Sequence, residues 1–256
     1  MSPVFDCTTT EGREAGIDAA RLAVADDECI VLPTDTVYGI GADAFSVTGV
    51  TSLLAAKGRG RDMPPPVLVP DLRTVDGLAM SVPSYARRLM EELWPGGLTL
   101  IFRSQPSLAW DLGDTNGTVG LRMPDDEVAL ALLSETGPLA VSSANQSGKP
   151  AATTVTEAGF ALGPSVDVYL DGGPRGEQLP STILDCTKAD PVVLRAGSVS
   201  DDRLREVLAG VELVIGYQVP EEPGPVDLGK RVDGDDEPTD DDEDPQTDTA
   251  DPTDQP

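Results

Sequence analysis

A cluster of basic residues is the first feature of this sequence that could do chemistry. Lys57, Arg59 and Arg61 alternate with two glycines, directly after a stretch with a helical pattern. Lys offers a compact positive charge and Arg a planar fork of donors, so the combination suits a phosphate group. Cations at the C-terminus of a helix can also simply complement the helix dipole. Because the chain has only 4 lysines and a formal net charge of −27, we interpret the cluster as a phosphate grip.

Two polar segments follow apolar runs that are typical of buried strands. Pro33–Ala44 (PTDTVYGIGADA) follows Cys29–Leu32, and Ser142–Gly148 (SSANQSG) follows Leu139–Val141. Sheets of α/β proteins bind ligands beyond the carboxyl ends of strands, where hydroxyl and amide groups suit a nucleotide. Ordinary turns have the same composition, and each segment alone leaves that alternative open. Similar polar motifs occur further along, at Gly120–Pro124 (GLRMP), Ser181–Asp185 (STILD) and Leu194–Gly197 (LRAG).

The residue types exclude several common catalytic arrangements. The chain has no histidine, which removes Ser-His-Asp and Cys-His catalysis and histidine-ligated zinc. It has no GxxxxGK[ST] phosphate loop. Gly39–Ala44 matches a GxGxxA dinucleotide fingerprint, but six residues separate it from the preceding strand, whereas the first glycine should lie in the tight turn itself. Chemistry must therefore depend on carboxylates, hydroxyls, amides, Lys and Arg.

In their order along the chain, the motifs resemble those of the YrdC/Sua5 family of threonylcarbamoyl-AMP synthases. The resemblance extends from about Asp18 to Leu208 and rests on PTDTVYGIGADA, KGRGR, WPGGLT (Trp94–Thr99), LRMP, SSANQSG, PSTILD and LRAG. It implies an α/β fold, a single YrdC-like domain with a twisted mixed parallel and antiparallel sheet and flanking helices around a concave groove. It also implies a nucleotidyltransferase that joins L-threonine, bicarbonate and ATP into threonylcarbamoyl-AMP and releases diphosphate.

The resemblance further implies partners and a cofactor. The product would feed the N6-threonylcarbamoyl (t6A) modification of adenosine 37 in tRNA, through the tRNA threonylcarbamoyltransferase machinery. Mg²⁺ is expected with ATP, held mainly by phosphates and water rather than by a protein metal site. The amine of threonine can capture bicarbonate as a carbamate that attacks the α-phosphorus, so no protein nucleophile is required. The acidic net charge predicts at most weak direct RNA binding.

Site residues are carried over where this sequence matches the family's motifs. The KxR motif falls on Lys57 and Arg59, which are implied to be catalytic and to bind ATP. The SxN motif falls on Ser143 and Asn145, which are implied to bind ATP together with Arg195. The residues implied to bind threonine are Thr34, Thr36, Tyr38, Arg122 and Ser181.

The sequence departs from the family at one position. After KxR the family often has NPL followed shortly by a histidine that is associated with the threonine pocket. Here the stretch Met63–Val69 is MPPPVLV, and Leu68 stands in place of that histidine. Another donor must hold threonine, or this subgroup binds it differently.

Functions of two other classes remain open. A non-catalytic RNA-binding or ribosome-maturation module could use the same groove, because YrdC-like domains have been linked to RNA binding through a basic concavity. Steep salt dependence of RNA binding without ATP turnover would favour it. A carbamoyl-transfer or hydrogenase-maturation domain should bring zinc-finger or carbamoyl-phosphate segments, which this chain lacks.

The elements that must position these residues alternate between helical and extended patterns. The predicted helices are Glu11–Val24, Val47–Ala56, Tyr85–Leu93, Glu127–Ser134, Thr156–Ala161 and Arg203–Leu208. The predicted strands are Cys29–Leu32, Val67–Val69, Leu98–Phe102, Val119–Leu121, Leu139–Ser142, Val166–Leu170, Ile183–Asp185 and Val192–Leu194. The last three strands leave no room for crossover helices, which predicts a mixed sheet in a single α/β domain.

Composition changes near Gly216. Residues 221–256 contain 15 acidic and 2 basic residues and no aromatic residue, too little apolar surface to offset the entropy of an ordered chain. We therefore predict a catalytic domain at 1–216 and a disordered acidic tail at 217–256. The widely spaced Cys7, Cys29 and Cys186 predict buried thiols in a reducing compartment. Without an 18-residue apolar run or a signal-peptide pattern, we expect a cytoplasmic protein that does not contact membranes.

Overall fold

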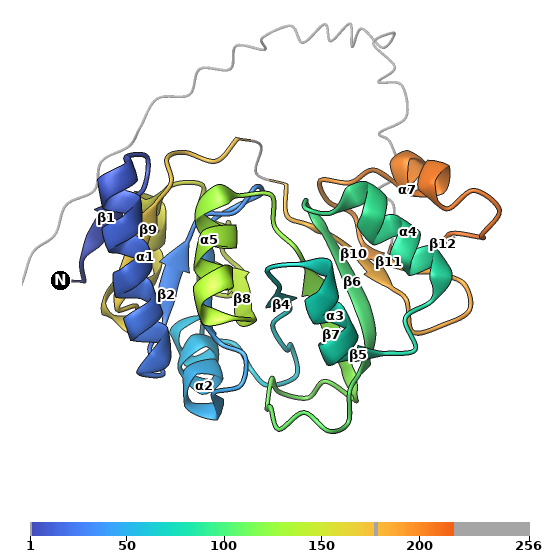
Figure 1. Ribbon diagram of the computed structural model, residues 1–256, viewed down its shortest axis with the longest axis horizontal. Coiled ribbons are helices and arrows are strands. Elements are labelled where there is room, and N and C mark those ends of the chain that lie inside the picture. The colour runs from blue at the N-terminus through green and yellow to red at the C-terminus, as the bar shows by residue number, and fades with distance from the viewer. Residues whose placement is uncertain (1, 177–178, 218–256) are drawn as a thin grey trace, which may run out of the picture. The chain divides into compact units, whose positions relative to one another are not determined.

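The computed structural model describes residues 2–176 and 179–217 of the chain (Figure 1). The predicted acidic tail at 217–256 lies outside the described residues, except for Tyr217. The predicted α/β architecture is confirmed, because helices flank a single mixed sheet.

In the described residues the helices are α1 (Thr10–Ala25), α2 (Val47–Ala56), α3 (Leu72–Leu78), α4 (Ser84–Leu93), α5 (Glu127–Thr136), α6 (Val155–Leu162), α7 (Asp201–Val207) and the short 3-10 helix η1 (Gly163–Ser165). The helices other than α4 and η1 begin where the sequence supplies a side chain that caps them. Thr9, Ser46 and Asp126 each accept a hydrogen bond from the first turn of the helix that follows. Such caps satisfy backbone N–H groups that have no partner inside the helix.

Twelve strands form one sheet in the described part of the chain. They are β1 (Val4–Asp6), β2 (Ile30–Leu32), β3 (Gly39–Asp43), β4 (Val67–Leu68), β5 (Ala79–Met80), β6 (Leu98–Ser104), β7 (Thr118–Arg122), β8 (Leu139–Ser143), β9 (Val168–Asp171), β10 (Thr182–Asp185), β11 (Val192–Arg195) and β12 (Val214–Ile215). Their order is β1-β9-β2-β3-β8-β4-β7-β6-β10-β11-β12, and β5 pairs with β6. Parallel pairs such as β4 with β7 and antiparallel pairs such as β3 with β8 occur together, as predicted.

Two apolar clusters hold the layers together. One packs α1 and α5 against β2, β8 and β9, and it includes Ile30, Leu132 and Leu170. The larger one joins α2, α3, α4, α6 and α7 to the sheet, and it includes Val31 of β2, Ala140 of β8 and Tyr169 of β9. The sheet is therefore fixed from both directions, and the side chains at its strand ends are held in place.

The strand β3 was not predicted from the sequence, because its glycines suggest a loop. Gly39 and Gly41 lie where β3 passes close to β2 and β8. A Cβ atom at Gly39 would come within 2.6 Å of the Val141 side chain, and one at Gly41 within 3.2 Å of the Leu32 side chain. Glycine therefore allows the close approach of neighbouring side chains. The GxGxxA match is part of a strand and its end, not a tight dinucleotide-binding turn.

The three cysteines are free and buried. Burial raises the pKa of Cys7 to about 11 and that of Cys29 to about 12, so these thiols stay protonated at neutral pH. In the residues that the structure describes, no helix is both long and apolar enough to cross a membrane.

Candidate active site

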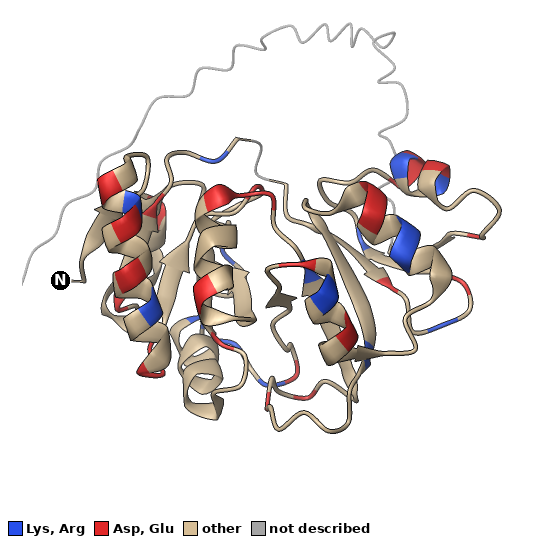
Figure 2. Cartoon of the chain, in the orientation of Figure 1, with Lys and Arg blue, Asp and Glu red and all other residues tan. Residues whose placement is uncertain are grey.

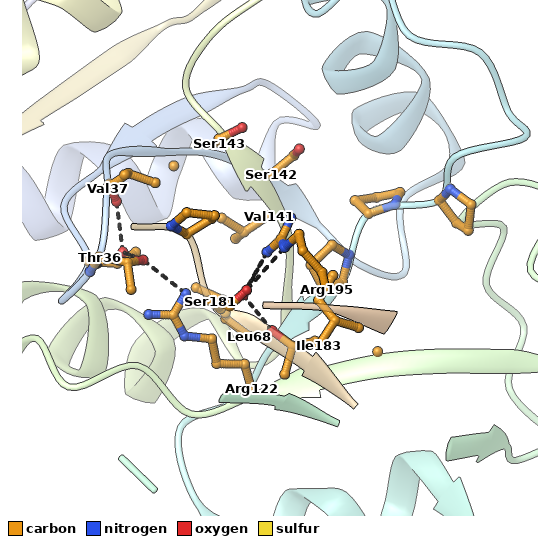
Figure 3. A pocket seen from close by; sticks show the side chains of 18 of the residues that line it. Thr36, Val37, Leu68, Arg122, Val141, Ser142, Ser143, Ser181, Ile183 and Arg195 are labelled. Carbon is orange, nitrogen blue, oxygen red and sulfur yellow. Dashed lines mark hydrogen bonds between the residues drawn. The ribbon is translucent and has the colours of Figure 1, made fainter. Parts of the chain in front are cut away.

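A pocket of about 480 Å³ is lined by residues of the central strands, such as Gly120 of β7 and Ile183 of β10, and by the loops between strands (Figure 3). This volume lies within the range of about 300–1,000 Å³ that is usual for small-molecule sites. All the site residues predicted from the sequence line it except Lys57: Thr34, Thr36, Tyr38, Arg59, Arg122, Ser143, Asn145, Ser181 and Arg195. The fold thus brings together segments that are separated by up to about 160 residues in the chain.

The pocket is positively charged although the chain is strongly acidic. Arg59, Arg122, Lys149 and Arg195 line it, and its described lining contains no Asp or Glu. Figure 2 shows where the acidic residues are instead: many lie along the helices, for example on α1 and α5. The pocket is therefore suited to an anionic ligand.

Arg59 reaches the pocket from the segment that follows α2. One terminal nitrogen of its guanidinium donates a hydrogen bond of 3.0 Å to the hydroxyl of Ser142 on β8. Its Nε is buried and has no partner among the described residues. Burial lowers the pKa of Arg59. A buried donor that lacks an acceptor is costly, so this nitrogen indicates an acceptor that arrives with a ligand.

Arg195, at the end of β11, faces the same pocket. Its guanidinium donates to the carbonyl oxygen of Ser181 at 2.7 Å and to the Ser181 hydroxyl at 3.1 Å. That hydroxyl lies 2.9 Å from the hydroxyl of Thr99 on β6. The pKa of Arg195 is lowered, first by burial and then by the positive charges of Arg122 and Arg59. Because Arg122 is paired with Asp35, an anion in the pocket would chiefly stabilise Arg59 and Arg195.

Lys57 does not line the pocket but lies behind it. It is buried at the C-terminus of α2. Its ammonium donates to the backbone carbonyls of Ser143 and Asn145, at 2.7 Å in the second case, and lies 3.4 Å from the Asn145 side-chain oxygen. Burial, with a smaller contribution from Arg59, lowers the pKa of Lys57 to about 8. Its catalytic role stays a prediction. Its contacts indicate that it positions the segment Ser143–Lys149, which carries the SxN motif and is called the SxN loop below.

The side-chain amide of Asn145 also forms its hydrogen bonds within the SxN loop. Its amide donates to the carbonyl oxygens of Gln146 at 2.8 Å and of Lys149 at 2.7 Å. These bonds shape the turn after β8 and leave Ser143, at the end of that strand, on the pocket side. The ATP-binding roles of Ser143 and Asn145 stay predictions.

The loop between β2 and β3 forms the opposite side of the pocket. The hydroxyl of Thr34 donates to the carbonyl oxygen of Val37 at 2.7 Å and lies 3.1 Å from the hydroxyl of Thr36. Arg122, at the end of β7, donates to the Thr36 hydroxyl at 3.1 Å and forms an ion pair of 2.6 Å with Asp35. On this side, Arg122 holds the Thr36 hydroxyl, and Asp35 neutralises the charge of Arg122. The Thr34 hydroxyl lies beside that of Thr36.

Tyr38 is fully buried and its hydroxyl is occupied by the protein. The oxygen lies 2.7 Å from the carbonyl oxygen of Gly173 and 3.1 Å from the Asp171 carboxylate, and it accepts from the N–H of Gly172 at 3.1 Å. Burial raises its pKa. Tyr38 is part of the pocket lining, and its hydroxyl anchors the segment after β9.

The sequence did not identify Asp35, Asp126 and Arg175 as residues of the site. Asp35 lies inside the PTDTVYG motif and could have been expected beside Arg122. Arg175 is the lone cation in the polar turn after β9, and only the fold shows that it pairs with Asp126 at 2.8 Å.

Leu68, at the position of the family's histidine, lines the pocket from β4 and is almost completely buried. Val141 on the neighbouring strand β8 and Ile183 on β10 add further apolar side chains to the pocket lining (Figure 3). No imidazole donor is present here, so the polar groups of the pocket come from Thr, Ser, Asn, Lys and Arg.

The side chains of the site can bind and orient anions, but they include few groups that could take part in covalent or acid–base catalysis. Its described lining contains no carboxylate that could act as a base and no cysteine or histidine nucleophile. Guanidinium groups aimed into a partly buried site stabilise charge that develops on phosphate oxygens. The arrangement therefore favours a reaction between two bound substrates during which negative charge develops on phosphate oxygens.

The family comparison gives an independent view of the chain. The Sua5_yciO_yrdC family model, described as telomere recombination, matches residues 23–197. This match covers all the residues that line the pocket, from Thr34 to Arg195.

Individual relatives agree with the family match. Over 211 residues, the chain is 54% identical to a putative threonylcarbamoyl-AMP synthase of Mycobacterium leprae (strain TN), covering 82% of this chain and 96% of that protein. It is 38% identical over 200 residues to the threonylcarbamoyl-AMP synthase of Bacillus subtilis (strain 168), covering 77% of this chain and 58% of the relative. The crystal structure of P. abyssi Sua5 complexed with L-threonine matches with a TM-score of 0.73 at 32% identity, covering 77% of this chain and 58% of that one.

Proposed function

The chain belongs to the Sua5/YciO/YrdC family, and from this premise we propose that it is a threonylcarbamoyl-AMP synthase. Its relatives that carry this name are nucleotidyltransferase-type enzymes. The proposed substrates are L-threonine, bicarbonate and ATP, and the products are threonylcarbamoyl-AMP and diphosphate. The product would be passed to the machinery that makes t6A at position 37 of tRNA. A cytoplasmic location is part of the proposal and is supported by the three free, buried cysteines.

The observation that carries the proposal is the charge of the pocket. Three arginines and a lysine line a cavity of about 480 Å³ with no acidic residue in its described lining. This arrangement stands out in a chain whose net charge is −27. A triphosphate supplies negative charge to Arg59 and Arg195, which have no carboxylate partner among the described residues.

In the proposed reaction the protein binds and orients substrates rather than forming a bond with them. Arg59 and Arg195 would contact phosphate oxygens and stabilise the charge on the departing diphosphate. Thr34, Thr36 and Arg122 would hold threonine so that its carbamate oxygen faces the α-phosphorus. Holding two reactants in this geometry replaces a bimolecular encounter with a step inside one complex.

We infer that any Mg²⁺ is carried by the nucleotide and water. In the described part of the chain, no three His, Cys, Asp or Glu side chains group together as a metal site. The donors in the pocket are cations, hydroxyls and amides, which suit phosphate better than a divalent ion. No step of the proposed reaction is assigned to a metal.

The test is diphosphate release with ATP, bicarbonate and each amino acid in turn. We expect release that depends on both threonine and bicarbonate, with serine and valine as controls that each lack one part of the threonine side chain. Diphosphate release that does not depend on threonine would overturn the proposal. RNA binding that weakens steeply with salt, without any ATP turnover, would instead support the alternative of a non-catalytic RNA-binding module.

A further inference from the structure

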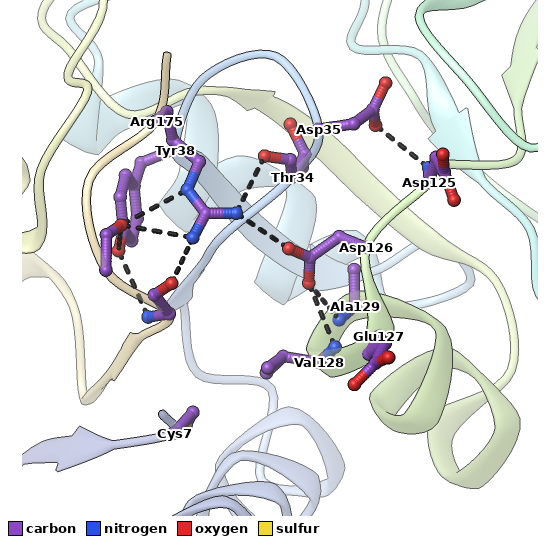
Figure 4. Close-up of polar contacts among 12 residues, drawn as sticks. Cys7, Thr34, Asp35, Tyr38, Asp125, Asp126, Glu127, Val128, Ala129 and Arg175 are labelled. Atoms are coloured by element: carbon purple, nitrogen blue, oxygen red, sulfur yellow. Dashed lines mark hydrogen bonds and ion pairs between the residues drawn. The ribbon is translucent and has the colours of Figure 1, made fainter. Parts of the chain in front are cut away.

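Arg175 is the centre of a polar network that lies beside the pocket and that the proposed reaction does not use directly (Figure 4). One terminal nitrogen donates to Asp126 at 2.8 Å and to the backbone carbonyl of Thr34 at 3.3 Å. The other terminal nitrogen donates to the carbonyls of Gly172 and Gly173. One side chain thus contacts three segments: the loop after β2, the start of α5 and the turn after β9.

The network is sheltered from solvent. The Arg175 and Asp126 side chains are only 14% and 10% exposed, so their ion pair differs from the weak pairs of protein surfaces. The Arg175 guanidinium also lies 5.7 Å from the centre of the Tyr38 ring. Asp126 uses its second oxygen to cap α5, accepting from the N–H groups of Val128 and Ala129 at 2.9 Å each. The network therefore links a helix start, a buried ring and the pocket loop in fixed positions.

The contact with Thr34 connects this network to the pocket. Arg175 holds the carbonyl of Thr34, whose hydroxyl is bonded to Val37 and lies beside the hydroxyl of Thr36. Thr36 in turn accepts from Arg122. Without Arg175, the loop would lose one of its anchors, the hydrogen bond to the Thr34 carbonyl, and the position of the Thr34 hydroxyl and of the neighbouring Thr36 hydroxyl would be less closely defined.

We propose that Arg175 is a positioning residue for the amino-acid substrate, which sets the loop that carries Thr34 and Thr36. The inference rests on the proposed function, because it takes these hydroxyls as the threonine site. ATP should be held mainly from the other side, by Arg59 and Arg195, neither of which contacts Arg175. Loss of Arg175 should therefore weaken threonine binding selectively.

The variants Arg175→Gln and Asp126→Asn test this selectivity by steady-state diphosphate release. Asp126→Asn keeps an oxygen that can cap α5 but removes the charge that faces Arg175. We expect both variants to raise the KM for threonine by about tenfold, because a small displacement of a binding group is enough for such a loss. The KM for ATP should stay within about twofold. The double variant should be no worse than Arg175→Gln alone, since the two residues act through one contact.

The matched control is Arg13→Gln. Arg13 also pairs with the first turn of α5, through Glu127 at 2.9 Å, but that pair is exposed and does not line the pocket. It should leave both KM values unchanged. Equal increases in the KM values for threonine and ATP, or no change in either folded variant, would overturn the positioning role alone. A wild-type protein without threonine-dependent release would overturn the proposed function and this inference with it.

Discussion

The two sides of the pocket treat positive charge in different ways. On one side, Arg59 and Arg195 contact hydroxyls and a carbonyl, and neither forms an ion pair with a carboxylate among the described residues. On the other side, Arg122 is paired with Asp35, and behind it Arg175 is paired with Asp126. The arginines of the first side lack a negatively charged partner until an anion binds, whereas those of the second side already have one within the protein.

This difference indicates that the two sides of the pocket have different roles, one in anion binding and the other in positioning hydroxyl groups. Arg59 is half-buried and Arg195 is exposed, and neither has a carboxylate partner among the described residues, so this side gains most when an anion binds. The paired side gains little from an anion and instead keeps hydroxyl groups in place. We therefore expect removal of a cation to affect catalysis on the first side, and removal of a charge to affect stability on the second.

The largest expected effect is on stability, for the variant Asp35→Asn. It leaves Arg122 buried without a counter-charge, because the two side chains are 8% and 17% exposed. Breaking such a pair should lower the free energy of unfolding by about 3–5 kcal/mol, measured by urea denaturation. The control is Asp111→Asn, which breaks the exposed pair with Arg61 and should cost less than about 1 kcal/mol. Equal losses in the two variants would show that the Arg122–Asp35 pair matters no more for stability than an exposed pair.

The next effect is on catalysis, for the variant Arg59→Ala. Loss of one preorganised donor to a charged group should lower kcat by about 10²–10³-fold. Its stability should not fall, because the variant also removes a half-buried charge that has no carboxylate partner among the described residues. Arg61→Ala is the matched control two residues away, because Arg61 pairs with Asp111 outside the pocket. Turnover of Arg59→Ala like that of the wild type would show that this side does not act on phosphate.

A smaller effect is expected from pH, through Lys57. Its pKa is lowered to about 8, so the ammonium is present below that pH and loses a proton above it. The neutral amine has two N–H donors for three nearby acceptor oxygens, which loosens the SxN loop. The kcat/KM for ATP, at saturating threonine, should therefore fall by about tenfold as pH rises through 8. NMR titration of the Lys57 signal should give the same midpoint, and a midpoint near its ordinary value of 10.5 would contradict this account.

The smallest effect is expected from deletion of residues 218–256. Every residue that lines the pocket lies between Thr34 and Arg195, so both sides of the pocket remain when the acidic segment is removed. We expect kcat and both KM values to stay within about twofold, because the deleted segment has too little apolar content to add to a preformed site. A larger change in the KM for ATP than in that for threonine would show that the segment acts on the unpaired arginines.

The sequence predicted most of the elements, and its errors have physical causes. The predicted helices and buried strands, such as α2 and β8, have clear apolar periodicity and are confirmed. The two-residue strands β5 and β12 were not predicted, because they are too short for periodicity to define. The strand β3 was missed because glycine usually indicates a turn, whereas here it permits close packing with Val141.

The sequence by itself determined the inventory of the site: the arginines, the hydroxyls, the order of the motifs and the absence of histidine. Only the tertiary structure decided what each cation does. Lys57, Arg59 and Arg61 look equivalent in the sequence, yet they bind a loop, face the pocket and pair with Asp111, respectively. The reason is distance along the chain. The partners that decide these roles lie 50 to 88 residues away, and local spacing carries no information about them.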